Sequence, residues 1–176
     1  MFLLNDNLIL DYKKEGLLDI EGLDLDLLHP TYYYFRLGKW AKIWDEKQRD
    51  YQPIELEGTG KNVLTIPARG YCLVQSLERF KCSSKVLAIF GQISALPRRG
   101  LRLNHSPSID PNFTGYLELG LENLLEHPVE LEYKENIGKI MFFNISETFP
   151  VREIQGTISE KEYKRREHLR SPEPIL

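Results

Sequence analysis

The chain has 176 residues, which suits one domain that buries a sizeable core without support from disulfides or a structural metal. Hydrophobic residues make up 41% and charged residues 28%, the balance of an ordinary globular protein. The formal net charge of -3 gives no general attraction to nucleic acid or to an anionic membrane. We therefore expect no nucleic-acid and no membrane partner, because a polyanion would need a local basic patch.

Cysteine usage and the first residues indicate the compartment. Cys72 and Cys82 are too few for a disulfide framework or a zinc site, so we expect both to be reduced and at least partly buried. The opening residues, MFLLNDNLIL, lack the basic leader and apolar run of a signal peptide. No later stretch approaches the roughly 20 apolar residues of a spanning helix. A cytoplasmic location is the simplest expectation.

Residues 6–15 are predicted to form a short helix. Leu8, Ile9 and Tyr12 fall on one face, and an Asn-Asp pair at the start can supply the N-cap. Gly16 stands where a left-handed residue commonly ends a helix. This helix would precede the rest of the domain.

The following residues lose the helical period. Residues 17–20 and 23–28 alternate apolar with acidic side chains, which predicts a strand with one wet face. Short apolar runs separated by Gly and Pro then continue through the chain, a spacing typical of a sandwich or barrel. These runs are residues 33–37, 63–66, 71–77, 86–90, 116–121 and 140–145. We predict a mainly β fold whose core is antiparallel.

The C-terminal residues differ in character from the domain before them. Residues 159–170 (SEKEYKRREHLR) carry a capping box at Ser159 and Glu162 and basic residues toward the end, which predicts a helix. It has little apolar face, so it is either a solvated helix or frayed tail, or a partner-binding or lid segment. The predicted division is therefore a β domain over residues 1–155 and a charged helix or tail over 156–176.

The segment with the sharpest functional signal is residues 108–115 (SIDPNFTG), which lead into the strand YLELGLEN. It resembles the nucleotide-binding hairpin of the dCTP deaminase/dUTPase superfamily. The resemblance implies a deoxyribose pocket shaped by Ile109, Asp110 and Phe113. The Asp110 carboxylate would accept the sugar 3′-hydroxyl, and the Phe113 ring under C2′ would leave no room for a 2′-hydroxyl.

Three more segments resemble this superfamily in the same order, so that the resemblance extends over most of residues 4–150. HPTYYYFRLG (residues 29–38) is similar to Pro-x-Ser-x-Asp-Leu-Arg-Leu-Gly, and YCLVQSLERF (71–80) to Leu-x-x-Thr-x-Glu. Residues 129–143 resemble the closing strand pair. The N-terminal helix favours the deaminase branch.

Membership of this superfamily would imply a particular architecture and ligand. The fold would be a dUTPase-like antiparallel β-sandwich or barrel. The assembly would be a homotrimer with pockets between subunits. The ligand would be a deoxynucleoside triphosphate, dCTP or dUTP, with Mg²⁺ bridging its phosphates.

The phosphate-binding motif departs from the family pattern. Gly-Arg-Ser-Ser is replaced by GQIS (residues 91–94), which keeps Ser94 but loses the arginine. Because Gln92 cannot replace the bidentate charged contacts of Arg, phosphate capture should be weaker. Arg98 and Arg99 either compensate for the lost arginine or are surface residues of a turn without a role in binding.

The catalytic position also departs. An ungapped alignment from Asp110 places Gly120 where the family carries the Glu that shuttles protons between the attacking water and the leaving ammonia. Glu118 and Glu122 project to the same face, each about 6.8 Å away along the strand. Proton transfer needs a contact of about 3 Å or a single bridging water. Glu118 or Glu122 could therefore act only if a bulge, a register shift or a different substrate pose brought it closer. Otherwise both are ordinary strand residues.

Other family features are replaced or missing. Tyr32 and Tyr34 replace the family's Ser and Asp. The C-terminal region lacks the family motif that closes as a lid over the nucleotide. The four histidines are scattered, which gives no support for a metal site.

Two hypotheses follow. The chain is either a deoxynucleotide-binding enzyme that deaminates dCTP or hydrolyses dUTP, or a catalytically silent homologue that acts as a nucleotide sensor, sponge or trimeric scaffold. The replaced Glu and Arg favour the second slightly.

Overall fold

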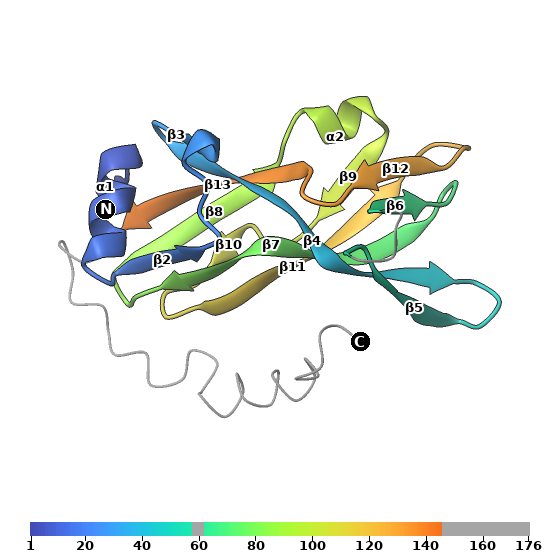
Figure 1. Cartoon of the computed structure of the whole chain (residues 1–176), viewed down its shortest axis with the longest axis horizontal. Coiled ribbons are helices and arrows are strands. Elements are labelled where there is room, and N and C mark those ends of the chain that lie inside the picture. The colour runs from blue at the N-terminus through green and yellow to red at the C-terminus, as the bar shows by residue number, and fades with distance from the viewer. Residues whose placement is uncertain (58–61, 146–176) are drawn as a thin grey trace.

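A computed structural model describes residues 1–57 and 62–145, and within them the fold is mainly β. The long strands run along the long axis of the molecule, with α1 at one end and β5, β6 and β12 toward the other (Figure 1). In chain order the elements are β1 (Phe2–Leu3), α1 (Asp6–Lys14), β2 (Leu18–Glu21), the 3₁₀ helix η1 (Leu25–Leu27), β3 (Leu28–His29), β4 (Tyr32–Asp45), β5 (Asp50–Glu55), β6 (Val63–Ile66), β7 (Tyr71–Cys82), β8 (Val86–Gln92), α2 (Ala95–Arg98), β9 (Leu101–Asn104), β10 (Ser108–Ile109), β11 (Thr114–Asn123), β12 (Val129–Glu132) and β13 (Asn136–Asn144). No helix among these residues is long and apolar enough to cross a bilayer.

The predicted N-terminal helix is confirmed as α1. The Asn5 side chain accepts a hydrogen bond from the Leu8 backbone N–H at 2.9 Å, and Gly16 has a φ of 71°. The predicted strand over residues 23–28 is wrong. Asp24 accepts from the Asp26 N–H at 3.0 Å, and this local turn bond starts η1 instead of a strand. The predicted helix within residues 156–176 lies outside the described residues.

Strand β4 connects the two halves of the fold. The described strands form an 11-stranded sheet in which the path runs β10-β8-β13-β4-β7-β11-β9, and a separate pair of β6 and β12. Every pairing between them is antiparallel. The first part of β4 pairs with β13 and its later part with β7 and β5, and the register shifts between Leu37 and Ala41. The chain therefore changes partners at this shift, as in a curled sandwich or barrel.

Side chains of β4 alternate between core and outer face, as the apolar run predicts. Tyr33, Phe35 and Leu37 are completely buried, whereas Tyr32 and Tyr34 face outward and are half-buried.

The two cysteines lie in the core as free thiols. Burial raises the pKa of both Cys72 and Cys82 to about 12, so both remain protonated at physiological pH.

A completely buried carboxylate, Glu78, lies where β4 and β7 cross. The Arg36 Nε donates to Glu78 Oε1 at 2.7 Å, and the Arg36 backbone N–H donates to Oε2 at 2.9 Å. The Tyr33 hydroxyl donates to Oε1 at 3.2 Å, and it stays protonated because burial, and then the charge of Glu78, raise its pKa. Arg36 also donates to Asp24 at 3.3 Å and to the Gly22 carbonyl at 2.9 Å. The buried charge is thus paired and fully hydrogen-bonded.

The same crossing requires a small residue at position 38. A Cβ on Gly38 would lie 2.6 Å from the carbonyl oxygen of Ser76, so a larger residue would push the strands apart. The Ser76 hydroxyl donates to the Glu78 carbonyl at 2.7 Å and accepts from the Leu117 N–H at 2.8 Å. Ser76 therefore joins the irregular part of β7 to β11, the strand that follows residues 108–113.

Glu78→Gln should lower the free energy of unfolding by about 3 kcal/mol, because it leaves the Arg36 guanidinium without its buried counter-charge. We place the effect at the low end of the usual 3–5 kcal/mol because Arg36 keeps its contact with Asp24. Urea denaturation measures it. Glu126→Gln, which breaks the exposed pair with Arg69, is the matched control and should leave the midpoint unchanged. Equal midpoints for both variants would contradict a central role for Glu78.

Candidate functional site

The predicted hairpin at residues 108–115 is present, and its apolar side chains are buried in the core. Ile109 is 3% exposed and Phe113 8%, and the Phe113 ring lies against Gly115. The turn is closed by the Phe113 N–H, which donates to the Asp110 carbonyl at 3.2 Å, with Asn112 left-handed at a φ of 66°.

A second pair of backbone bonds ties the hairpin to β7 and the turn that follows it. The Cys82 N–H donates to the Phe113 carbonyl at 2.9 Å, and the Asn112 N–H donates to the Ser83 carbonyl at 3.3 Å. The hairpin is therefore held firmly on the main sheet.

Asp110 is the exposed acidic group of this hairpin. Its carboxylate makes no hydrogen bond or ion pair with any described residue, so it is available to a ligand hydroxyl. Phe113 is largely covered within the single chain, and only a small part of its ring is left for a ligand to touch. The structure thus brings the three predicted sugar residues together, with the polar one outward and the two apolar ones inward.

The predicted phosphate segment follows β8 and divides into structural and open positions. The Gln92 Oε1 accepts a hydrogen bond from the Leu103 N–H at 3.0 Å, so this side chain links the end of β8 to β9. Ser94 is exposed and its side chain does not cap α2. A Cβ on Gly91 would meet no described atom within 4 Å, which leaves open space above it.

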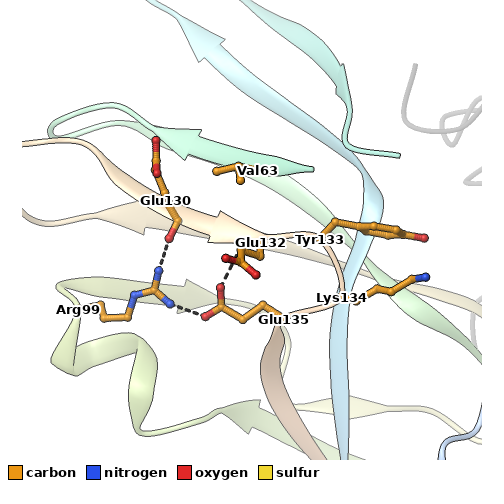
Figure 2. A pocket seen from close by; sticks show the side chains of 7 residues that line it. All are labelled: Val63, Arg99, Glu130, Glu132, Tyr133, Lys134 and Glu135. Atoms are coloured by element: carbon orange, nitrogen blue, oxygen red, sulfur yellow. Dashed lines mark hydrogen bonds and ion pairs between the residues drawn. The ribbon is translucent and has the colours of Figure 1, made fainter. Parts of the chain in front are cut away.

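The two arginines after this segment differ in what they contact. The Arg99 guanidinium donates to the Glu135 carboxylate and to the Glu130 carbonyl oxygen (Figure 2). Arg98 is exposed and makes no side-chain contact of this kind within residues 1–57 and 62–145. Arg99 therefore fixes α2 to the turn between β12 and β13, and Arg98 is the available cation.

Arg99 and Glu135 border a polar pocket of about 550 Å³ at this end of the molecule (Figure 2). Its lining residues are Val63, Arg99, Glu130, Glu132, Tyr133, Lys134 and Glu135. It lies around the β12–β13 turn, apart in the sequence from the Asp110 hairpin.

Gly120 lies in the middle of β11 and faces Tyr71 from the neighbouring strand. The register pairs Gly120 with Leu73 of β7 and with Asn104 of β9. A Cβ built on Gly120 would lie 1.9 Å from the Tyr71 hydroxyl oxygen and 2.6 Å from its Cζ. The tyrosine thus occupies the space into which a side chain at position 120 would project.

The two predicted catalytic glutamates share the outer face with Gly120 but differ in their contacts. Arg102 donates to Glu122 from Nε at 3.0 Å and from Nη2 at 2.5 Å, so Glu122 is engaged in an ion pair. Glu118 is exposed and opposes Gln75 in the register. The one register irregularity between β11 and β7 lies between Tyr116 and Glu118, and no shift brings Glu118 or Glu122 to position 120.

Tyr32 and Tyr34 form an aromatic cluster on the outer face of β4. Their hydroxyl oxygens lie 3.3 Å apart, and His29 stacks on Tyr32 with a centroid separation of 4.7 Å. Lys139 lies over the Tyr32 ring at 5.5 Å from its centroid. No three His, Cys, Asp or Glu side chains in the described part of the chain gather as metal ligands.

Two site features were missed from the sequence. The engagement of Arg99 by Glu135 joins residues far apart in the chain, and the overlap of Tyr71 with position 120 depends on strand register. The sequence shows Tyr71 at the start of one apolar run and Gly120 within another. Only the strand pairing reveals that the two residues are in contact.

Comparisons with known proteins agree with the resemblance. A family model described as dCTP deaminase-like matches residues 3–145. The dCTP deaminase of Pyrococcus horikoshii is 33% identical over 140 residues, which cover 80% of this chain and 84% of the relative. A dUMP-forming dCTP deaminase of Corynebacterium glutamicum is 28% identical over 157 residues, covering 82% of both chains.

A solved structure gives the same fold. The 2′-deoxycytidine 5′-triphosphate deaminase from Agrobacterium tumefaciens matches with a TM-score of 0.65 and 17% identity, over 80% of this chain and 48% of that one. At this identity the likeness shows the fold alone. It confirms the predicted dUTPase-like β architecture.

Gly120→Ala should be less stable than Gly91→Ala by about 1 kcal/mol, the low end of an overpacking cost, because only the first puts a Cβ into space that the end of the Tyr71 side chain must leave. Gly91 is the matched control, since its added methyl group meets no described atom. Thermal unfolding followed by circular dichroism compares the two variants. Equal melting temperatures would contradict the close contact between Tyr71 and position 120.

Proposed function

The chain belongs to the dCTP deaminase-like family, and on that premise we propose that it binds a deoxynucleoside triphosphate at the Asp110 hairpin. The observation that carries this proposal is the uncommitted, exposed Asp110 carboxylate on a turn whose Ile109 and Phe113 are anchored in the core. A rigidly held carboxylate suits recognition of a sugar hydroxyl, because little ordering is needed on binding. Phe113 beneath it supplies the apolar side of the sugar pocket.

Arg98 is the residue best suited to the triphosphate. It is the exposed arginine of the pair, whereas Arg99 is held by Glu135 and Glu130. Ser94 adds a hydroxyl that makes no capping hydrogen bond to α2. One arginine in place of a fuller cluster supports binding that is weaker than the family motif would give.

Mg²⁺ fits this site as an ion carried by the phosphates. The described residues hold no group of three acidic or imidazole ligands, and Mg²⁺ commonly binds through phosphates with only one or two carboxylates. When bound, it would neutralise phosphate charge and fix the phosphate geometry. Asp110 and Arg98 would meanwhile orient the sugar and the phosphates.

Hydrolytic deamination requires a group that takes a proton from water and delivers one to the leaving amine. Gly120 has no such group, and the Tyr71 hydroxyl occupies the space beside it. Glu122 is paired with Arg102. The second candidate function rests on these contacts: a nucleotide sensor or sponge that holds its nucleotide with slow or no turnover.

Asp110→Ala should weaken deoxynucleotide binding roughly ten- to more than a hundredfold, because it removes a charge-assisted hydrogen bond worth about 1.5–3 kcal/mol. Calorimetric titration with dCTP or dUTP and Mg²⁺ measures the change. Asp26→Ala, which removes another exposed carboxylate, is the control and should bind like the wild type. Equal wild-type affinity for CTP and dCTP, or no effect of Asp110→Ala, would sink the pocket assignment.

The binding sites are proposed to form between subunits of a homotrimer. Ile89 is 38% exposed and lies opposite Ser108 of the hairpin, so an apolar surface adjoins the proposed sugar site. Light scattering at micromolar concentration should give three times the 20.6 kDa of one chain. Ile89→Glu should shift the mass toward the monomer and weaken nucleotide binding with it, and a monomeric wild type would exclude sites between subunits.

A further inference from the structure

The sheet face around Gly120 carries a group of neutral polar side chains. Tyr71 and Gln75 extend from β7 and Asn104 from β9, and the register places all three on the same face as Gly120. None of the three side chains makes a hydrogen bond with another described residue. Leu73, directly opposite Gly120, supplies an apolar floor between them. The face thus offers hydrogen-bonding groups, unpaired among the described residues, around an apolar side chain.

Tyr71 is the most closely placed of these groups. Its hydroxyl oxygen is 1.9 Å from the ideal Cβ position of residue 120, so it stands at the centre of this face. Burial, followed by nearby Tyr51, Cys72 and Glu122, raises the pKa of this hydroxyl above its ordinary value. It is therefore a neutral group that both donates and accepts hydrogen bonds at physiological pH.

Charged groups lie at the border of this face and not at its centre. Glu122 lies opposite Tyr71 and is bound by Arg102, and Glu118 lies opposite Gln75. A neutral hydroxyl and a neutral amide therefore remain beside Gly120. Both groups can donate hydrogen bonds to the carbonyl groups of a pyrimidine edge and accept them from its imino or amino groups. Neither requires the base to be charged.

We propose that the Tyr71 hydroxyl, with Asn104 opposite Gly120 on β9, is the base-recognising group of the site and holds a pyrimidine without converting it. The inference rests on the proposed function, because the deoxynucleotide must first be placed by the Asp110 hairpin. It adds the base end of the site and assigns Tyr71 as a specificity-determining residue. It also explains why position 120 is glycine, since any larger residue displaces the tyrosine.

A carboxylate placed at position 120 alone therefore cannot occupy a productive position. The Gly120→Glu side chain would begin 1.9 Å from the Tyr71 oxygen, so the ring would have to leave or the strand would have to shift. Tyr71→Ala removes this obstacle. The two positions should behave as a coupled pair in a double-mutant cycle.

Tyr71→Phe is the sharpest probe of recognition, because it removes only an oxygen that has no hydrogen-bond partner among the described residues. Titration of dCTP and dUTP with Mg²⁺ should show a loss of affinity of about 3- to 10-fold, as expected for one neutral hydrogen bond. The melting temperature should not fall. Tyr51→Phe is the matched control, since Tyr51 packs edge-on against Trp44 and its hydroxyl should contribute nothing to binding.

The outcomes separate this inference from the function on which it rests. Wild-type binding with unchanged affinity in Tyr71→Phe overturns the inference and leaves the proposed function standing. Failure of the wild type to bind any deoxynucleoside triphosphate overturns both. Conversion of dCTP to dUTP by the wild type at about 1 s⁻¹ or faster also overturns it, because that rate is within the usual enzyme range.

The double-mutant cycle tests the contact without any nucleotide. Gly120→Glu should melt below the wild type, and adding Tyr71→Ala should recover part of the loss. Additive effects of the two substitutions would overturn the assignment of Tyr71 to the space above position 120.

Discussion

The buried carboxylate of Glu78 holds β4 and β7 together where the two halves of the sheet meet. An unpaired charge in the core would cost several kcal/mol, so Glu78 requires Arg36 and Tyr33 at fixed positions on β4. Those contacts hold the crossing at which β4 leaves β13 and joins β7. Ser76, two residues earlier, then ties β7 to β11 through the Leu117 N–H. The hairpin that carries Asp110 is positioned by the same set of hydrogen bonds.

The residues that resemble the family thus serve two different purposes. Arg36, Gly38, Ser76 and Glu78 build the strand crossing, and none of them is needed to touch a ligand. Asp110 projects outward from the hairpin instead. The matches to the family motifs lie in the scaffold and in the hairpin, and the departures lie at residues 91–94 and at Gly120.

Much of the fold was predictable because its signals are local. The cap at Asn5 and the turn in SIDPNFTG depend on neighbouring residues, and both appear in the structure as expected. The strand expected over residues 23–28 failed because the Asp24 side chain offers a local turn bond that competes with pairing. Alternation of apolar and acidic residues carried no information about that competition.

The site was less predictable because its decisive contacts are not local. Arg98 and Arg99 are equivalent in the sequence, and only the fold shows that Glu135 engages one of them. Gly120 appeared as the loss of a carboxylate, whereas in the sheet it is also the space that Tyr71 fills. Strand register decides both relations, and a single sequence specifies it only through the complete pattern of burial.

A crystal structure of the protein with a pyrimidine deoxynucleoside triphosphate and Mg²⁺ would show whether Asp110 and Tyr71 bind the same nucleotide. The sugar 3′-hydroxyl should lie about 2.5–3.0 Å from the Asp110 carboxylate, and the base edge should meet the Tyr71 hydroxyl at a similar distance. Density for a nucleotide away from the hairpin, or for a base that never approaches Tyr71, would contradict it.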